Sequence, residues 1–466
     1  MRVLFVTPEC APLTKTGGLG DVSAALPAAL RAQGADVRTF LPAYRDVSLE
    51  GARECARLRV LQMDARVLEN GEYLFLDCPP LYDRPGGPYQ DENGADWPDN
   101  ALRFGAFSRA AAIMGSAGSP LEWRPEIVHC NDWPTALAPV YMHFEERRAG
   151  SVMTVHNLAF QGLFHAGLLE PLELPRATFA VEGLEFYGKL SFLKGGLVYA
   201  DAISTVSPGY AREIQTEELG CGLDGVLRER RERLRGIVNG IDAEMWNPMA
   251  DRHIVERYSW TSLDRKAANK RALQERMNLR QDGAAPLLGT VCRFTHQKGV
   301  DLIAAATDEL VARGAQICML GRGDRELEGI FSALAARHPG NVSAAIGFNE
   351  DLAHQIEAGA DMFLMPSRFE PCGLNQMYSQ RYGTPPVARA TGGLADTIAD
   401  GETGFLFDRP ESAALIGAVK RAVEAYGDAR RWREIQRRGM TRDFSWAGPA
   451  RQYADLYARH ARTTAS

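Results

Sequence analysis

Short apolar runs recur along this chain, and each is followed by a polar or glycine-rich turn and then by apolar residues at helical spacing. Of all features of the sequence, this recurrence restricts the possible folds most strongly. Near the N-terminus, Val3–Thr7 predicts a buried strand, and apolar residues from Val22 to Leu30 recur at helical spacing. Gly34 is placed to end that helix, and Val37–Leu41 predicts the next strand. A strand, a crossover helix and a second strand form a βαβ unit, which predicts a parallel sheet.

The same pattern continues in two series. In the first half of the chain, strands are predicted at Ile127–Cys130, Ser151–Val155 and Ile203–Val206. The second series starts near residue 287, with strands predicted at Leu287–Cys292, Ile317–Leu320, Val342–Ile346 and Met362–Met365. Turn-forming residues between the two series predict a hinge, and a last helix is predicted at Trp446–Ala461.

We therefore predict an α/β chain of two doubly wound Rossmann-like domains, at residues 1–240 and 250–440, with a hinge at 241–249 and a C-terminal segment at 441–466. Ligands bind at the carboxyl ends of parallel strands, and pockets form preferentially between domains. The expected site lies in a cleft between the two domains.

The composition excludes several classes of protein. The 466 residues are 45% apolar and 24% charged, as in folded globular proteins, and the net charge of −6 predicts no nucleic-acid surface. The longest stretch without Asp, Glu, Lys or Arg, residues 149–169, contains two histidines, an asparagine and a glutamine, so it is too polar to span a membrane. No signal peptide is predicted, and the eight scattered cysteines form no Cys-x-x-Cys pair, so we expect reduced thiols and a cytoplasmic protein.

The first motif with chemical meaning is the loop Lys15–Asp21. Its glycines allow close approach of a ligand, the following helix N-terminus attracts phosphate, and Asp21 is a good N-cap. Gly18 and Gly20 half-fit the dinucleotide pattern Gly-x-Gly-x-x-Gly, but Ser23 takes the third place. The loop alone therefore leaves open a phosphate cradle, a nicotinamide site and a plain tight turn.

A second group of motifs follows strands of the later series. Arg293 and Lys298 lie between a predicted strand and a helix, which suits a diphosphate, although a solvated surface pair fits the spacing equally well. Glu370 follows another strand and could hold sugar hydroxyls or cap a helix. Cys372 is a weaker candidate nucleophile because no histidine is paired with it, and Thr391 begins a second Gly-Gly turn.

Polar side chains also end two strands of the first series. They are His129, Asn131, Asp132, His156 and Asn157. No further ligand and no His-Glu-x-x-His motif accompany them, so we expect a sugar site and no metal.

Taken together and in order, eight segments resemble bacterial glycogen synthase and plant starch synthase. They are Lys15–Leu19, Val155–Gly162, Ser191–Lys194, Thr205–Pro208, Val238–Asp242, Arg293 with Gln297–Gly299, Arg368–Leu374 and Thr391–Leu394. The resemblance covers nearly the whole chain. One departure is Asn131, which stands where some members of the family carry histidine.

The resemblance implies a retaining GT-B glycosyltransferase whose last helix crosses back onto the N-terminal domain. It implies transfer of glucose from ADP-glucose to the non-reducing end of an α-1,4-glucan such as glycogen, with no metal or other cofactor. The implied catalytic residues are Glu370, Asp132, His156, Arg293 and Lys298. The implied substrate-binding residues are Lys15, Gly17, Gly18, Asp21, Tyr89, Asn239, Cys372, Gly373, Leu374 and Thr391.

Specific roles follow from the same resemblance. Lys15 and the amides of Gly17 and Gly18 should face the donor phosphates, while the cations Arg293 and Lys298 should neutralise the departing diphosphate. The carboxylate of Glu370 should bind the transferred glucose. His156 and Asn239 should contact the sugar, and Asp132 should lie near the reacting centre.

Three other functions compete with this prediction. The same fold could use UDP-glucose or another acceptor, the Gly18/Gly20 pattern could serve a nicotinamide-dependent oxidoreductase, and the chain could bind glucan without catalysis. A glucan is uncharged, so the cations and Glu370 argue against the last function. The sequence predicts no nucleic-acid or membrane partner and does not determine the oligomeric state.

Overall fold

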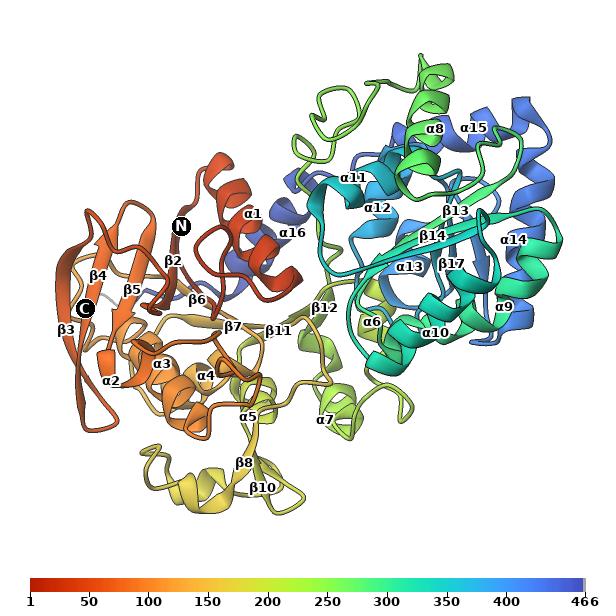
Figure 1. Cartoon of the computed structure of the whole chain (residues 1–466). Coiled ribbons are helices and arrows are strands. Elements are labelled where there is room, and N and C mark those ends of the chain that lie inside the picture. Colours follow the sequence, from red (N-terminus) through yellow and green to blue (C-terminus); the bar gives the residue numbers. More distant parts are fainter. Residues whose placement is uncertain (464–466) are drawn as a thin grey trace. The chain divides into compact units, whose positions relative to one another are not determined.

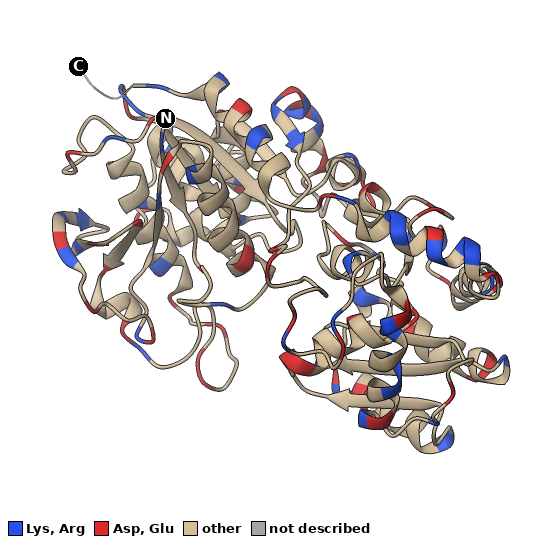
Figure 2. Cartoon of the chain, turned by 90° about the horizontal axis from the view of Figure 1, so that it is seen from above, with Lys and Arg blue, Asp and Glu red and all other residues tan. Residues whose placement is uncertain are grey.

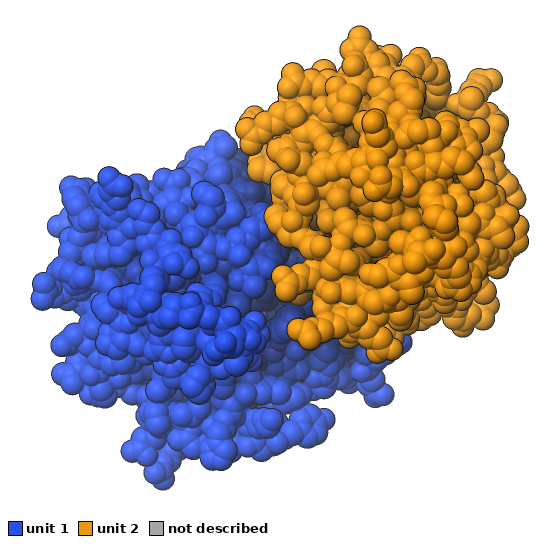
Figure 3. All heavy atoms as spheres, viewed as in Figure 1, with its two compact units in different colours: residues 1–206, 211–240, 446–466 blue, residues 207–210, 241–445 orange. Residues whose placement is uncertain are grey.

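The computed structural model describes residues 1–463, and the chain divides into two compact units (Figure 3). Unit 1 comprises residues 1–206, 211–240 and the segment from 446 onward, and unit 2 comprises residues 207–210 and 241–445. Each unit is built around its own largely parallel sheet covered by helices (Figure 1).

The main sheet of unit 1 has nine strands. Their order is β12 (Leu234–Gly236), β11 (Ala202–Thr205), β7 (Gly150–Val155), β6 (Ile127–Asn131), β1 (Arg2–Val6), β2 (Asp36–Pro42), β5 (Tyr73–Asp77), β4 (Met63–Asn70) and β3 (Arg53–Val60). All pairs from β12 to β5 are parallel, and β4 and β3 continue the sheet as antiparallel strands. The chain winds outward from β1 in one direction and then in the other, which is the doubly wound topology.

Unit 1 also contains a small antiparallel sheet and the helices that cover the large one. The small sheet has the order β8 (Leu163–His165), β10 (Lys189–Ser191) and β9 (Glu185–Phe186). The helices are α1 (Gly18–Ala32), α2 (Pro79–Tyr82), α3 (Asn100–Met114), α4 (Leu137–His143), α5 (Phe192–Tyr199), α7 (Asp224–Glu229) and α16 (Ala447–His460). Helix α6 (Pro208–Glu213) spans residues of both units.

The last helix of the chain belongs to unit 1. Helix α16 lies beside α1 (Figure 1), and its Tyr453 and Tyr457 share a buried cluster with Val3 and Phe5 of β1. The Tyr457 hydroxyl is also hydrogen-bonded to Nδ1 of His129 at 2.6 Å. The C-terminal helix therefore crosses back to the unit in which the chain begins.

The sheet of unit 2 has six strands, all parallel. Their order is β15 (Val342–Ile346), β14 (Gln316–Gly321), β13 (Leu287–Val291), β16 (Met362–Met365), β17 (Pro386–Arg389) and β18 (Phe405–Phe407). Counted along the chain, this is the order 3-2-1-4-5-6 of a Rossmann fold. The helices are α8 (Lys266–Arg276), α9 (Val300–Ala312), α10 (Arg325–Arg337), α11 (Glu350–Gly359), α12 (Asn375–Arg381), α13 (Gly392–Thr397), α14 (Ser412–Tyr426) and α15 (Ala429–Met440).

Charged residues of both signs are interspersed along the ribbons of both units (Figure 2). Within residues 1–463, no helix is both long enough and apolar enough to cross a bilayer.

The predicted strands and the final helix are confirmed to within a few residues, but one local expectation is wrong. Helix α1 begins at Gly18, with Gly17 as its N-cap, so Asp21 lies in the first turn instead of capping the helix. As expected, Gly34 follows α1 in a left-handed conformation, with φ of +88°.

Candidate active site

In each unit, most of the predicted site residues follow strands beside the point where the winding reverses. In unit 1 they follow the adjacent strands β1, β6 and β7, except for Tyr89, which lies between α2 and α3, and Asn239, which follows the edge strand β12. In unit 2 they follow the adjacent strands β13, β16 and β17. Open α/β sheets bind ligands at the carboxyl ends of strands at such a reversal, so each topology places its polar residues at a binding edge.

The loop after β1 in unit 1 is fixed by hydrogen bonds to a buried carboxylate. Oε2 of Glu9 accepts hydrogen bonds from the backbone N–H groups of Thr16 (2.6 Å) and Gly17 (3.0 Å). The Gly17 amide is therefore occupied. The amides of Gly18 and Leu19, at the start of α1, have no hydrogen-bond partner among the described residues. These two N–H groups form the anion-attracting end of the helix.

The exposed side of the same loop is open. Neither Gly17 nor Gly18 has an atom within 4 Å of the position that a Cβ would take. Nζ of Lys15 lies 2.8 Å from Oδ1 of Asp21, and both side chains are about half exposed. Because an exposed ion pair is weak, an incoming phosphate can compete for the Lys15 cation.

Asp132, after β6, combines backbone strain with a perturbed carboxyl group. Its φ of 57° and ψ of −178° fall in a region that is almost restricted to glycine. Oδ1 of Asp132 accepts a hydrogen bond of 2.7 Å from the His156 backbone N–H. Burial nevertheless outweighs this contact and raises the pKa of Asp132 to about 7. Strain and a raised pKa together mark a candidate functional carboxylate.

The His156 ring, after β7, is held in a single neutral tautomer. Nδ2 of Asn131 donates to the backbone carbonyl of Val6 at 3.0 Å, so Oδ1 of Asn131 faces Nε2 of His156, also at 3.0 Å. Nε2 must then be the donor, and Nδ1 is left as an acceptor. Burial lowers the pKa of His156 to about 3, which keeps the ring neutral. Asn131, the departure from the family pattern, thus orients a predicted sugar contact.

Two more residues of unit 1 were predicted to bind substrate. The hydroxyl of Tyr89 donates to Oε1 of Glu9 at 2.8 Å, and its ring packs near Trp133. Asn239 is 7% exposed, and its buried Oδ1 has no hydrogen-bond partner among the described residues. A buried amide oxygen without a partner carries a desolvation penalty that a sugar hydroxyl could remove.

In unit 2, the carboxylate of Glu370 is surrounded by donors. Its Oε2 lies 2.6 Å from Nζ of Lys298 and accepts a 3.0 Å hydrogen bond from the Ser367 hydroxyl. The side chain of Glu370 is 6% exposed and that of Lys298 is 20% exposed. Lys298 therefore neutralises a buried carboxylate in this structure and is not a free cation. The partner Ser367 was not among the predicted site residues.

Arg293 differs from Lys298 in that its guanidinium is unpaired. The residue is exposed two residues beyond the end of β13, and its side chain makes no hydrogen bond or ion pair with any described residue. The nearby Arg368 is engaged, since its guanidinium forms two 2.7 Å hydrogen bonds to Asp301. Arg293 is thus available to bind an anion through several N–H donors.

The segment from Cys372 to Leu374 packs against the turn that follows β17. The Gly393 N–H donates to the backbone carbonyls of Glu370 (3.1 Å) and Pro371 (3.2 Å). A Cβ on Gly393 would lie only 2.3 Å from the Cys372 carbonyl oxygen, so the close contact requires glycine. Gly373 is left-handed with φ of +71°, and Thr391, the N-cap of α13, is buried. Cys372 is 4% exposed, which fits packing better than nucleophilic attack.

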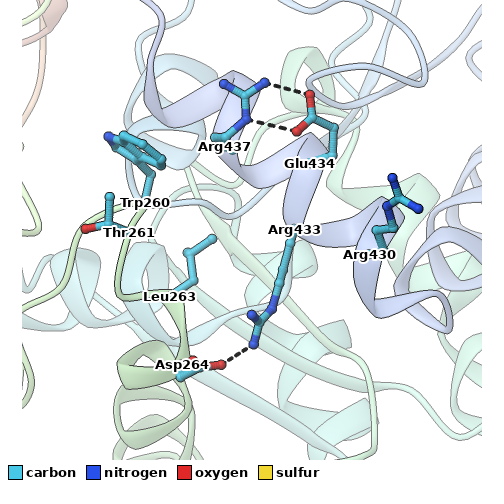
Figure 4. Close-up of a pocket in the computed structure, with 8 residues that line it drawn as sticks. All are labelled: Trp260, Thr261, Leu263, Asp264, Arg430, Arg433, Glu434 and Arg437. Atoms are coloured by element: carbon cyan, nitrogen blue, oxygen red, sulfur yellow. Dashed lines mark hydrogen bonds and ion pairs between the residues drawn. The ribbon is translucent and has the colours of Figure 1, made fainter.

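A pocket of unit 2 lies away from all of the predicted site residues. It has a volume of about 340 Å³ and lies along α15, where Trp260, Arg430 and Arg433 contribute to its lining (Figure 4). Arg433 pairs with Asp264, and Arg437 pairs with Glu434. In the described part of the chain, no three His, Cys, Asp or Glu side chains form a group that could hold a metal ion.

Sequence reasoning missed Glu9 and Ser367. Both follow a strand within three residues, which is the signal that identified the other polar site residues. The hydrogen-bonded partners of Glu9, however, lie 7 and 8 residues away at Thr16 and Gly17, and 80 residues away at Tyr89.

Two Rossmann units with polar residues at both reversal points define the class of GT-B glycosyltransferases. The family of starch synthase catalytic domains matches residues 2–229, and the glycosyl transferases group 1 family matches residues 273–439. A similar solved structure is the catalytic domain of starch synthase IV from Arabidopsis thaliana, bound to ADP and acarbose. Its TM-score is 0.85 and its sequence identity is 31%, and the match covers 98% of this chain and 99% of that chain. Sucrose-phosphate synthase from Thermosynechococcus elongatus, at 19% identity and a TM-score of 0.62, shares the fold.

The chain belongs to the bacterial glycogen synthase family. It is 54% identical to the glycogen synthase of Aromatoleum aromaticum, over 98% of this chain and 96% of the relative. It is 50% identical to that of Nitrosomonas eutropha, with the same coverage of 98% and 96%. The chain is accordingly a hexosyltransferase, and the alternative of a nicotinamide-dependent oxidoreductase is not supported.

Proposed function

We propose that this chain transfers glucose from ADP-glucose to the non-reducing end of an α-1,4-glucan such as glycogen, with retention of the anomeric configuration. One observation carries the proposal. In unit 2, a buried carboxylate (Glu370) and an unpaired guanidinium (Arg293) follow adjacent strands of one sheet. A sugar diphosphate offers both partners, because its hydroxyls suit the carboxylate and its phosphates suit the guanidinium.

The chemistry requires stabilisation of charge at the leaving group. Breaking the bond between glucose and diphosphate leaves positive charge on the sugar ring and negative charge on ADP. The unpaired guanidinium of Arg293 would oppose the negative charge, and Lys298 would contribute while it stays paired with Glu370. The free amides of Gly18 and Leu19 in unit 1 would add hydrogen bonds. Glu370, held by Lys298 and Ser367, would bind the glucose that is transferred.

Unit 1 would supply the remaining sugar contacts. Nδ1 of His156 is an acceptor, and Oδ1 of Asn239 is buried without a described partner, so both could receive sugar hydroxyl protons. Asp132 would lie near the reacting centre. Its strained backbone is the kind of feature that persists where function requires a fixed carboxylate.

For retention, we propose attack from the face of the leaving group in preference to a covalent glycosyl–enzyme. A covalent route needs an ionised, accessible carboxylate as nucleophile. The carboxylate of Glu370 is bound by Lys298 and Ser367, and that of Asp132 has a pKa of about 7. The contacts of Glu370 occupy its oxygen lone pairs, and the raised pKa of Asp132 leaves only part of that group ionised at neutral pH.

We also propose that catalysis needs no metal, because guanidinium, ammonium and helix N-terminal groups can supply the positive charge. A cytoplasmic location is part of the same proposal. All eight cysteines of the chain are free thiols, which fits a reducing compartment.

The test is ADP release from purified protein mixed with ADP-glucose and glycogen, with UDP-glucose in parallel and EDTA in every reaction. We expect release that requires glycogen, prefers ADP-glucose and continues with EDTA. Release only from UDP-glucose would overturn the donor assignment, and loss of activity in EDTA would overturn the metal-free mechanism. Binding of glycogen without release of either nucleotide would overturn the proposed transfer.

Gly18→Ala should weaken donor binding without weakening the fold. A Cβ added at this helix start would contact no atom within 4 Å. Alanine also stabilises a helix relative to glycine by about 0.5–1 kcal/mol, so the Tm should stay level or rise. The added methyl group would, however, stand beside the two free amides. We expect the KM for ADP-glucose to rise about tenfold, equivalent to about 1.4 kcal/mol.

The matched control is Gly417→Ala in α14, where an added Cβ also meets no atom within 4 Å. This variant should show the same or higher Tm and an unchanged KM. If Gly18→Ala also left KM unchanged, the free amides would not be the donor contact.

A further inference from the structure

Glu9 is a buried carboxylate that none of the proposed chemical steps uses. It lies three residues beyond the end of β1 and is 4% exposed. Its backbone carbonyl accepts a 2.8 Å hydrogen bond from the Thr7 hydroxyl, which in turn lies 2.8 Å from the Ser23 hydroxyl of α1. The residue is therefore fixed between the sheet and the helix that follows the glycine loop.

Both carboxylate oxygens of Glu9 are engaged. Oε2 accepts from the Thr16 and Gly17 amides at 2.6 and 3.0 Å, and Oε1 accepts from the Tyr89 hydroxyl at 2.8 Å. The three donors come from two separate segments of unit 1. Burying a carboxylate is unfavourable unless hydrogen bonds replace its hydration, and here three donors do so.

From this geometry we propose that Glu9 is a positioning residue for the donor loop. By taking the amides of Thr16 and Gly17, it fixes the peptide planes that precede α1. The next two amides, of Gly18 and Leu19, then remain unpaired at the helix start. The inference rests on the proposed function, because it assigns those amides to the phosphates of the donor. It adds a residue that acts through the loop and does not itself touch the substrate.

The second consequence of this placement concerns Asp132. The negative charge of Glu9 is among the causes that raise the pKa of Asp132, after burial. Glu9 therefore acts on the loop through hydrogen bonds and on Asp132 through charge. These two actions can be separated by substitution.

Glu9→Ala removes the hydrogen bonds and the charge together, whereas Glu9→Gln removes only the charge. Oε1 of glutamine can still accept from the two loop amides, and its Nε2 can donate to the Tyr89 oxygen. We expect Glu9→Ala to raise the KM for ADP-glucose at least about tenfold, because the loop amides are no longer preorganised. Glu9→Gln should keep KM within about threefold of the parent value.

The pH profile provides a readout that loss of stability would not change. Removing the negative charge in Glu9→Gln should lower the pKa of Asp132 and move the corresponding limb of the kcat/KM profile to lower pH. The matched control is Asp201→Asn. Asp201 is a buried carboxylate of unit 1 that accepts from the Ser151 N–H at 2.9 Å and pairs with Arg148. Its loss should lower Tm while leaving KM and the pH profile unchanged.

Hydrogen exchange of the unliganded protein tests the same inference without activity. The amides of Thr16 and Gly17, which Glu9 holds in the parent, should exchange faster in Glu9→Ala than in the parent, but not in Asp201→Asn. An unchanged KM together with unchanged exchange in Glu9→Ala would overturn the positioning role. If the parent protein released no ADP while exchange still accelerated in Glu9→Ala, the proposed function would fail but the loop contact would stand.

Discussion

Glu370→Gln is expected to lower the rate of ADP release about 10²–10³-fold, which corresponds to roughly 3–4 kcal/mol of lost transition-state stabilisation. The side chain is almost fully buried, and its Oε2 contacts both Lys298 and Ser367. Glutamine keeps the volume but lacks the negative charge. It would leave the Lys298 ammonium without its counter-ion and the positive charge developing on glucose without compensation.

The same substitution should also lower stability. Removing one member of a buried ion pair leaves the other uncompensated, and such losses reach about 3–5 kcal/mol for fully buried pairs. Lys298 retains some contact with water at 20% exposure, so the loss here should be smaller. Turnover must therefore be measured well below the Tm of the variant.

A second buried glutamate of unit 2 offers a matched control. Glu357 on α11 is 1% exposed, and burial raises its pKa well above the usual value, which favours the neutral acid over the carboxylate. Glutamine closely resembles a neutral glutamic acid, so Glu357→Gln should leave both turnover and Tm nearly unchanged. Equal activity losses in the two variants would contradict a specific role for Glu370.

Asp132→Asn is expected to lower turnover at least about 10²-fold, because the proposed mechanism places this carboxyl group beside the reacting centre. Asparagine can keep the hydrogen bond from the His156 N–H, so the local backbone should be retained. The measurement is ADP release under saturating substrate. If the variant released ADP at the parent rate, Asp132 would not be part of the active site.

The same substitution should change how stability depends on pH. Burial raises the pKa of Asp132 from 3.8 to about 7, so between these values the folded state binds more protons than the unfolded state. The contribution of Asp132 to stability is therefore complete below about pH 4 and is lost as pH rises through 7. Asparagine does not titrate in this range. The Tm of Asp132→Asn relative to the parent should increase from pH 4 to pH 8, and a constant difference would contradict the raised pKa.

The central parallel strands of both sheets were the most predictable part of the fold, although the parallel strands β5, β12, β17 and β18 were not predicted. Leu287–Cys292 was predicted and β13 spans Leu287–Val291, while Trp446–Ala461 was predicted and α16 spans Ala447–His460. Strands buried on both faces form continuous apolar runs, which periodicity detects directly. The antiparallel strands β3 and β4 were not predicted, because their partly exposed faces break up the apolar signal.

The placement of the candidate site residues at strand ends was predictable because chain topology brings the carboxyl ends of parallel strands to one edge. Asp132, His156, Arg293 and Glu370 were all identified in this way. Their chemical states were not predictable, because these depend on neighbours distant in sequence. Lys298 pairs with Glu370, which lies 72 residues away in the sequence. His156 is hydrogen-bonded to Asn131, which lies 25 residues away.

By itself, the sequence determined the two doubly wound sheets, the polar residues at their strand ends and the resemblance to the glycogen synthase family. These depend on local periodicity, on turn-forming residues and on the identity of short motifs. Only the tertiary structure decided that Glu9 holds the glycine loop, that Lys298 is paired while Arg293 is not, and that the pKa of Asp132 is about 7. Hydrogen bonding and desolvation depend on which groups meet in space, and the linear order of residues does not specify that.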